Sequence, residues 1–320
     1  MAALAFPGIL GFARPQQDFR RVPTPSRGCF TIGMAAPSSS AAYDPNFLHA
    51  AVPIPLPTAA GINCVLPYTH FSVNLDRVRG LAIATGVNID GNLLANVARS
   101  NDWHLDPRIP EQEQTGEAVY ARNDLDRGHL VRRRDPVWGD ETTATHANYD
   151  TFAFTNAAPQ AADFNQSKEL WLGLEDHVLA YARAHRNRIS VFTAPVLAED
   201  DPIYRGVGIP QLFWKIAAWT TTADGNRSLR AAGFILDQRP QLSDIDLEAA
   251  RIRANNIGDP PPLGPFRTFQ VPIVDIATIT GLDVLVLSEA DALASVQAVA
   301  EGAAPRARWA ELLDSAAVRL

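Results

Sequence analysis

Residues 123–138 limit what this chain can be more than any other stretch, because they crowd guanidinium groups around one histidine. The stretch is NDLDRGHLVRRRDPVW. His129 can exchange a proton near neutral pH, whereas an arginine stays charged and presents forked donors that match phosphate oxygens. Five arginines lie between Arg122 and Arg134, against three aspartates at positions 124, 126 and 135. The stretch therefore predicts a basic cleft that draws a polyanion onto a titratable base.

The charge of the whole chain differs from that of this stretch. Over 320 residues the formal net charge is −7, a poor match to the overall basic surface expected of a nucleic-acid-binding domain. We favour a basic cleft on an acidic body, and a solvated charged segment is the alternative. The two cysteines, Cys29 and Cys64, exclude a C-x-x-C zinc site and a disulfide-dense scaffold, and they leave one bridge open.

The four residues Asp126 to His129 resemble the DRGH signature of the DNA/RNA non-specific endonucleases, the endonuclease G-like branch of the ββα-metal (His-Me finger) nucleases. Downstream blocks resemble the family's TN-x-x-PQ, NQ and W-x-x-LE patterns at residues 155–160, 165–166 and 171–175. Other similar segments are residues 43–48, 68–73, 87–91 and 280–282. The resemblance implies an α+β fold, with a ββα-metal finger nuclease core on a central, mainly antiparallel sheet flanked by helices.

The resemblance also implies roles for particular side chains. His129 would be the general base in phosphodiester hydrolysis, and Arg127 would secure the phosphate. A single Mg²⁺, for which Mn²⁺ can substitute, would rest on Asn165 and several waters, because oxygen ligands suit such a hard ion better than zinc. Asn156 and Glu175 would support the reaction, Glu175 through the metal waters. The ten residues from Asn165 to Glu175 exceed the usual spacing, and we place the extra residues at the start of the helix.

Three further arginines are candidates for binding the substrate. Arg108 resembles a position where the family often keeps an arginine near the substrate, and an ion pair in a surface loop is an equal alternative. Arg132 and Arg134 follow the motif, and alternation along a strand would send Arg133 to the opposite side. We interpret the remaining histidines, which lack such neighbours, as structural: His49, His70, His104, His146, His177 and His185.

Composition predicts one folded domain between a disordered N-terminal tail and a helical C-terminal extension. Residues 1–42 are rich in Pro, Ser, Ala and Arg and predict a disordered N-terminal tail. Met34 is an alternative start. Residues 43–289 would form the DNA/RNA non-specific endonuclease domain. Residues 290–320, rich in Ala, Leu, Glu and Arg, predict a C-terminal helical extension.

Patterning along the chain predicts the elements of that domain. Prolines between residues 51 and 67 predict an extended edge segment or loop, and residues 105–114 should form a loop. Residues 119–131 should supply a β arm with the DRGH residues at its turn. Aromatic and β-branched residues predict strands at 68–74, 80–87, 151–154, 189–192, 211–220 and 229–236. Apolar periodicity and a capping serine predict a helix at 167–185, and residues 242–253 also look helical. Residues 271–280, followed by Gly281, resemble the final helix of the endonuclease family.

The sequence as a whole predicts a metal-dependent endonuclease that binds DNA and RNA through the phosphate backbone, since phosphate contacts carry no sequence information. A nucleic-acid-binding or toxin–antitoxin-like module without turnover, and a structural interaction protein, are the alternatives. The sequence leaves open whether an inhibitor protein binds the chain and whether the chain forms a homodimer. No apolar run reaches the roughly 18 residues that span a bilayer, so no membrane partner is expected. No basic residue precedes the apolar start, which favours the cytoplasm slightly over secretion.

Overall fold

An eight-stranded antiparallel sheet is the framework of the protein. The computed structural model describes residues 42–58, 63–123, 125–161, 180, 182, 187–239, 267–293, 308–312 and 318. Neighbouring strands of the sheet follow the order β1-β2-β3-β6-β9-β10-β11-β12, and β4-β5 and β7-β8 form two separate pairs. The strands are β1 (Asn63–Tyr68), β2 (Phe71–Asp76), β3 (Leu81–Asp90), β4 (Leu125–His129), β5 (Ala157–Ala161), β6 (Arg188–Val196), β7 (Ile203–Tyr204), β8 (Val207–Gly208), β9 (Leu212–Ala223), β10 (Asn226–Asp237), β11 (Arg267–Val271) and β12 (Ala310–Leu312).

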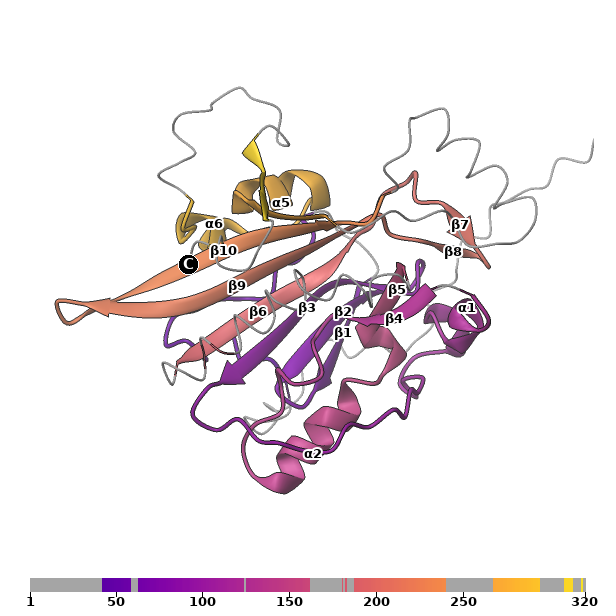
Figure 1. Ribbon diagram of the computed structural model, residues 1–320, viewed down its shortest axis with the longest axis horizontal. Helices are drawn as coiled ribbons and strands as arrows, with labels where there is room; N and C mark the ends of the chain where they lie inside the picture. The colour runs from indigo at the N-terminus through magenta and orange to yellow at the C-terminus, as the bar shows by residue number, and fades with distance from the viewer. Residues whose placement is uncertain are drawn as a thin grey trace, which may run out of the picture.

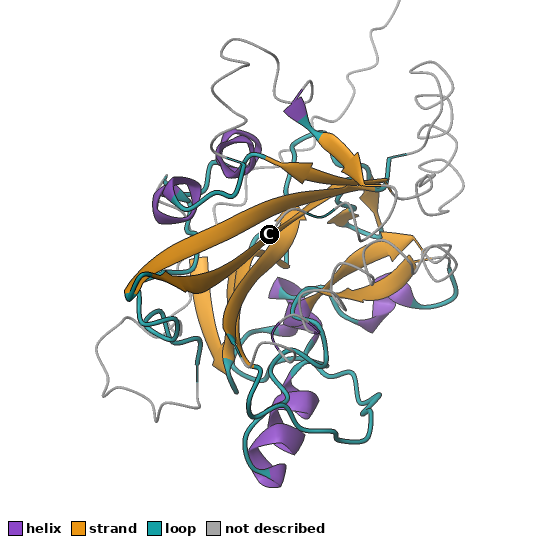
Figure 2. Cartoon of the chain, turned by 60° about the vertical axis from the view of Figure 1, so that its left-hand side comes forward, coloured by secondary structure: helices purple, strands orange, loops and turns teal. Residues whose placement is uncertain are grey.

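Helices cover both faces of this sheet (Figure 1). The described helices are α1 (Glu117–Tyr120), α2 (Glu141–Asp150), α5 (Ile273–Thr280) and α6 (Leu285–Glu289), with short 3-10 helices at Glu111–Glu113 and Phe154–Asn156. Figure 2 shows α5 and α6 on one side of the sheet and α1, α2 and the β4-β5 pair on the other. The predicted α+β architecture on a mainly antiparallel sheet is confirmed. No helix among the described residues is long and apolar enough to cross a membrane.

Each face of the main sheet carries an apolar core. On the α5 side, Trp214 of β9 packs in one core with Ile273 and Ile276 of α5. On the other side, Phe213 of β9 packs in a second core with Ala158 of β5. Successive side chains of a strand point to opposite faces, so β9 contributes to both cores. The β4-β5 pair therefore lies on a rigid, buried support.

One buried glutamine ties the β4-β5 pair to the main sheet. Gln238, just after β10, accepts a hydrogen bond from the Ala161 N–H at 3.2 Å. Its amide nitrogen donates to the Pro159 carbonyl at 3.3 Å and to the Pro210 carbonyl at 2.5 Å. Because the side chain is fully buried, these bonds hold the end of β5 at a fixed place beside β10.

Five predicted strands are present as β2, β3, β6, β9 and β10, and the predicted helix at 271–280 is α5. Gly281 ends α5 in a left-handed conformation with φ of 69°, a position that glycine fills without steric cost. The proline-rich segment ends in β1, an edge strand, so the first of its two predicted alternatives, an extended edge segment, is present there. Pro67 is tolerated there because β1 is the edge strand of the sheet. The predicted helix at 242–253 lies outside the described residues.

Three other expectations about local structure are wrong. The DRGH residues lie within strand β4 instead of at a turn, and the end of α1 occupies residues 119 and 120 of the expected β arm. Residues 154–156 form a 3-10 helix, and the strand begins only at Ala157. Residues 310–312 of the expected helical extension are a strand, β12, which pairs with β11. In each case contacts with distant residues override the local pattern.

Candidate active site

Strand β4 presents Arg127 and His129 on the same face, because residues two apart on a strand point the same way. Between them, Gly128 pairs with Ala158 of the antiparallel strand β5. A Cβ atom on Gly128 would lie 2.1 Å from Cδ and 2.4 Å from Oε1 of Gln160. The side chain of Gln160 thus occupies the space that a Cβ at position 128 would need, which favours glycine there.

The chain just after His129 is held by Asn156. The Asn156 carbonyl accepts from the Leu130 N–H at 2.9 Å, and its Oδ1 accepts from the Val131 N–H at 2.9 Å. Its Nδ2 donates to the carbonyls of Val131 and Thr151, at 2.9 and 3.0 Å. The side chain is fully buried. Asn156 was predicted to support catalysis. Its side chain hydrogen-bonds to the backbone just after His129 and so helps to position His129.

The His129 imidazole lies among aromatic rings. Its centroid is 4.8 Å from that of Trp103, and Phe152 presents its ring edge-on at 5.1 Å. Nε2 is buried and has no hydrogen-bond partner among the described residues. Burial, followed by the charges of Arg99 and Arg133, lowers the pKa of His129 to about 3. The imidazole is therefore neutral at pH 7, with a ring nitrogen left to interact with a reacting group.

Four arginines crowd the same region. Burial, then the like charges of Arg99, Arg134 and Arg132, lowers the pKa of the Arg133 guanidinium. Arg133 donates to Asn148 Oδ1 of α2 at 3.2 Å, and the Arg99 guanidinium lies 5.8 Å from the centroid of Phe152. Such mutual repulsion is relieved when an anion binds, so the cluster suits a polyanion such as a nucleic-acid backbone.

Arg127 lies beside Trp103, the ring that packs on His129, and is paired with Glu117. Its guanidinium donates to Glu117 Oε1 at 2.6 Å and lies 5.8 and 5.7 Å from the ring centroids of Trp103 and Tyr120. Glu117 is exposed, so this ion pair is weak in water. A phosphate oxygen can displace the carboxylate without leaving a buried charge unpaired.

Comparison with known proteins identifies the family of this chain. The family model described as "DNA/RNA non-specific endonuclease" matches residues 55–290. The chain belongs to this family. The matched residues include β4, β5 and the whole arginine cluster.

The chain is also similar to individual proteins, two of which are named as nucleases. The chain is 40% identical over 264 residues to an uncharacterized protein of Sinorhizobium fredii, covering 75% of this chain and 38% of that protein. It is 22% identical to a nuclease of Nostoc, covering 70% of this chain and 73% of the nuclease. It is 27% identical to mitochondrial endonuclease G of Bos taurus, covering 51% of this chain and 53% of the relative. The chain thus spans less than two thirds of two of these relatives.

A solved structure shares the fold. The crystal structure of the EndoG/EndoGI complex, described as showing the mechanism of EndoG inhibition, superposes with a TM-score of 0.52. The similarity covers 80% of this chain and 94% of the solved chain, at 18% sequence identity.

In this member of the DNA/RNA non-specific endonuclease family, the substrate candidates fall in two places. Arg132 and Arg134 belong to the cluster beside His129. Residues 133–136 form a turn, so the expectation that strand alternation turns Arg133 away is wrong. Arg108 lies elsewhere: its Nε donates to Asp106 Oδ1 at 2.9 Å and its Nη1 to the Pro67 carbonyl at 2.8 Å. The ion-pair alternative for Arg108 is therefore present in the structure.

Arg99 and Trp103 beside His129 were not predicted from the sequence. Arg99 lies outside the motif and has no neighbouring arginines. Trp103 is an aromatic residue in the polar stretch RSNDWHLD, and an aromatic residue that breaks a polar loop is the one signal that marks it.

The predicted metal ligand Asn165 and its supporting residue Glu175 lie outside the described residues. Ala180 and Ala182, within the predicted helix at 167–185, are helical. Among the described residues no group of three His, Cys, Asp or Glu side chains could hold a metal. A neutral amide oxygen such as that of Asn165 fits Mg²⁺, a hard ion that keeps several waters.

Proposed function

We propose that this protein is a metal-dependent endonuclease that hydrolyses the phosphodiester bonds of DNA and RNA without distinguishing the sugar. The observation that carries the proposal is the buried Nε2 of His129, which has no partner among the described residues and lies beside a cluster of arginines. Membership of the DNA/RNA non-specific endonuclease family supports it. So does the similarity to a nuclease of Nostoc and to bovine endonuclease G.

His129 is the proposed general base. Since its lowered pKa keeps it neutral at pH 7, it is ready to accept a proton from a water molecule that attacks phosphorus. A bond forms between the water oxygen and phosphorus, and the bond to the leaving sugar oxygen breaks. The phosphate also brings negative charge next to the imidazole, which offsets the arginines and raises the basicity of His129 as the substrate binds.

The arginines are the proposed anion site. Arg127, Arg132 and Arg134 neutralise phosphoryl oxygens, with Arg99 and Arg133 adding positive charge. Because all of these contacts go to phosphate, none discriminates base sequence. A cleft of this kind binds DNA and RNA alike, and its affinity falls as salt rises.

Asn165 is the proposed ligand of a single Mg²⁺, with Mn²⁺ as a substitute and Glu175 acting through the ion's waters. The ion, when bound, supplies charge stabilisation for the leaving oxygen. Asn156 serves this chemistry indirectly, by fixing the backbone next to His129.

An inhibitor protein is a proposed partner as well. The solved structure that shares the fold is the EndoG/EndoGI complex, which is described as showing the mechanism of EndoG inhibition. An inhibitor of this protein would have to cover the arginine cluster and would therefore carry acidic side chains.

The experiment that tests the proposal compares cleavage of supercoiled plasmid and of structured RNA, in Mg²⁺ and in EDTA. We expect cleavage of both in Mg²⁺ and of neither in EDTA. Asn165→Ala should abolish cleavage and also abolish binding of Mn²⁺, followed by electron paramagnetic resonance. Glu175→Ala should keep the ion and lose about 10–100-fold in rate, as is typical of residues that act through a metal's ligands. Cleavage of only one nucleic acid, or undiminished cleavage in EDTA, would contradict the proposal.

A further inference from the structure

A pocket of about 370 Å³ lies near the His129 site, and Arg108, predicted to bind the substrate, is one of its lining residues. Its walls come from the β1–β2 turn, from the loop at residues 104–108 and from α2. The loop separates the two sites: Trp103 packs on His129, whereas the next residue, His104, lines the pocket. One side of a single extended segment thus faces the proposed reaction centre, and its other side faces the pocket.

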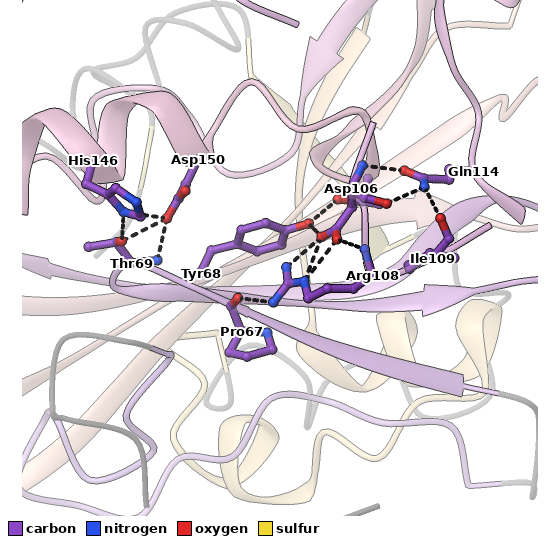
Figure 3. Close-up of polar contacts among 10 residues, drawn as sticks. Pro67, Tyr68, Thr69, Asp106, Arg108, Ile109, Gln114, His146 and Asp150 are labelled. Carbon is purple, nitrogen blue, oxygen red and sulfur yellow. Dashed lines mark hydrogen bonds and ion pairs between the residues drawn. The ribbon is translucent and has the colours of Figure 1, made fainter. Parts of the chain in front are cut away.

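The polar wall of the pocket is preorganised (Figure 3). Asp106 is almost fully buried and pairs with the Arg108 guanidinium at 2.9 Å. The Tyr68 hydroxyl bonds to Asp106 and lies 2.6 Å from Thr155 Oγ1. The Arg108 guanidinium also lies over the Tyr68 ring, 4.7 Å from its centroid. These side chains cannot rearrange freely, so a ligand finds the wall already shaped.

The pocket is also lined by two stacked aromatic rings. The rings of His104 and Tyr149 stack with centroids 4.3 Å apart and planes 8° from parallel. Tyr149 is nevertheless 41% exposed, and His104 is oriented by its Nδ1 contact with the Asp102 carbonyl at 2.8 Å. An exposed flat ring whose orientation is fixed is the type of surface on which unpaired nucleobases stack.

The charges in the pocket favour a base over a phosphate. Two carboxylates line it, Asp106 and Asp150. Asp150 accepts from the backbone and the hydroxyl of Thr69, both at 2.8 Å. Arg108 also lines the pocket, but its guanidinium is paired with Asp106, so the negative charge that remains is that of Asp150. A neutral ring with hydrogen-bonding edges meets no repulsion from Asp150, whereas a phosphate would.

The pocket is also connected to the anion site. Asn148, next to Tyr149 on α2, accepts from Arg133 at 3.2 Å and donates to the Ala98 carbonyl at 3.2 Å. Arg133 and Arg99 are the arginines whose charges act on His129. The anion site and the pocket therefore share helix α2, which contributes Asn148 to the first and Tyr149 to the second.

We propose that this pocket receives one unpaired nucleobase of the substrate strand, close to the phosphate that is cleaved, with Tyr149 and His104 as its stacking platform. This inference rests on the proposed function and adds a base subsite to a site that otherwise contacts phosphate. Stacking is tolerant of base identity because every base has a π face. The subsite thus adds affinity for unpaired strands without adding sequence specificity.

Binding without cleavage tests the inference. A short phosphorothioate single strand carries 2-aminopurine, whose fluorescence is quenched by stacking, at each position in turn, and binding is measured in EDTA. Tyr149→Ala removes the platform, and Tyr149→Phe keeps the ring. Thr145→Ala is the matched control, because Thr145 is an exposed residue of α2 that does not line the pocket.

We expect quenching at the positions of the strand that reach the pocket for the wild type, Tyr149→Phe and Thr145→Ala. In Tyr149→Ala the quenching should disappear and the dissociation constant should rise by about 5- to 150-fold, the range of a lost base–aromatic stack. Equal affinity and equal quenching in Tyr149→Ala would overturn the inference, as would a wild type that quenches no position. Plasmid cleavage by the same wild-type preparation reports separately on the proposed function, so the two failures can be told apart.

Discussion

Gln160 covers Gly128 so closely that a methyl group on the glycine would lie 2.1 Å from the glutamine Cδ. These residues come from the two blocks of the sequence that most resemble the endonuclease family, and they meet across the β4-β5 pair. Gln160 is itself almost fully buried, which limits where its side chain can move. The contact therefore explains in steric terms why a glycine separates Arg127 from His129.

Gly128→Ala should destabilise the protein by about 1–3 kcal/mol, the usual effect of overpacking a well-packed site. It should also reduce nuclease activity, because β4 carries His129. The measurement is urea unfolding of the single variants and of Gly128→Ala with Gln160→Ala. We expect the second substitution to recover part of the loss, since it removes the clashing atoms. A double variant whose loss equals the sum of the single losses would show that Gln160 is not the obstacle.

The stability of the protein should depend on pH through His129. Its pKa is lowered to about 3 in the folded protein, whereas an unfolded histidine titrates near 6.5. Above about pH 6.5 both states are neutral there, and this residue contributes no pH dependence. As the pH falls below that value, His129 is protonated in the unfolded chain but stays neutral in the folded protein. The free energy of unfolding therefore drops by up to about 1.4 kcal/mol per pH unit.

His129→Gln should lack this part of the pH dependence, and urea unfolding of both proteins between about pH 4 and pH 7 measures the difference. Other groups cancel in the comparison, including Asp201, whose pKa burial raises to about 6. Parallel curves for the two proteins would show that His129 is not held neutral by the fold.

The strands of the main sheet could be predicted because each carries its own signal. β6, the first part of β9 and the second part of β10 are runs of mostly apolar, β-branched and aromatic residues that are almost all buried, a pattern that few other structures accommodate. The end of α5 was marked by Gly281, whose left-handed conformation few other residues adopt at low cost.

What the sequence could not show depends on contacts between distant residues. Residues 310–312 are Ala, Glu and Leu, good helix formers, yet they add a strand to the edge of β11. Residues 154–156 leave the strand pattern where the Asn156 side chain bonds to Thr151 and Val131. Helix α2 was not predicted because its surface lacks an apolar stripe. Asp140, which caps it by accepting from the Thr143 N–H, was the available signal.

The same limit applies to the candidate site. The motif located His129 and most of the arginine cluster, because these residues are neighbours in sequence. Arg99 and Trp103 reach His129 only through the folded path of the chain. For Arg108 the sequence allowed two roles, binding the substrate or forming an ion pair in a surface loop. Only the structure shows that it pairs with Asp106.

Arg134→Gln should weaken binding of nucleic acid uniformly across sequences. Arg134 is exposed and adds to the positive charge around Arg133, so its loss removes one phosphate contact without disturbing the core. The slope of log affinity against log salt should fall by about 1. Arg267→Gln is the control, because Arg267 pairs with Glu311 on β11 and β12. A salt slope unchanged by Arg134→Gln, or changed equally by Arg267→Gln, would place the anion site elsewhere.

The most direct test of the account is the single-turnover rate of His129→Ala with Mg²⁺ and saturating DNA. A general base supplies about 10²–10⁴-fold in rate, so the account predicts a loss of that size with DNA affinity nearly unchanged. Because the substitution opens a space beside Trp103 and Phe152, added imidazole should restore part of the rate. A folded His129→Ala protein that cleaves DNA at nearly the wild-type rate would contradict the account.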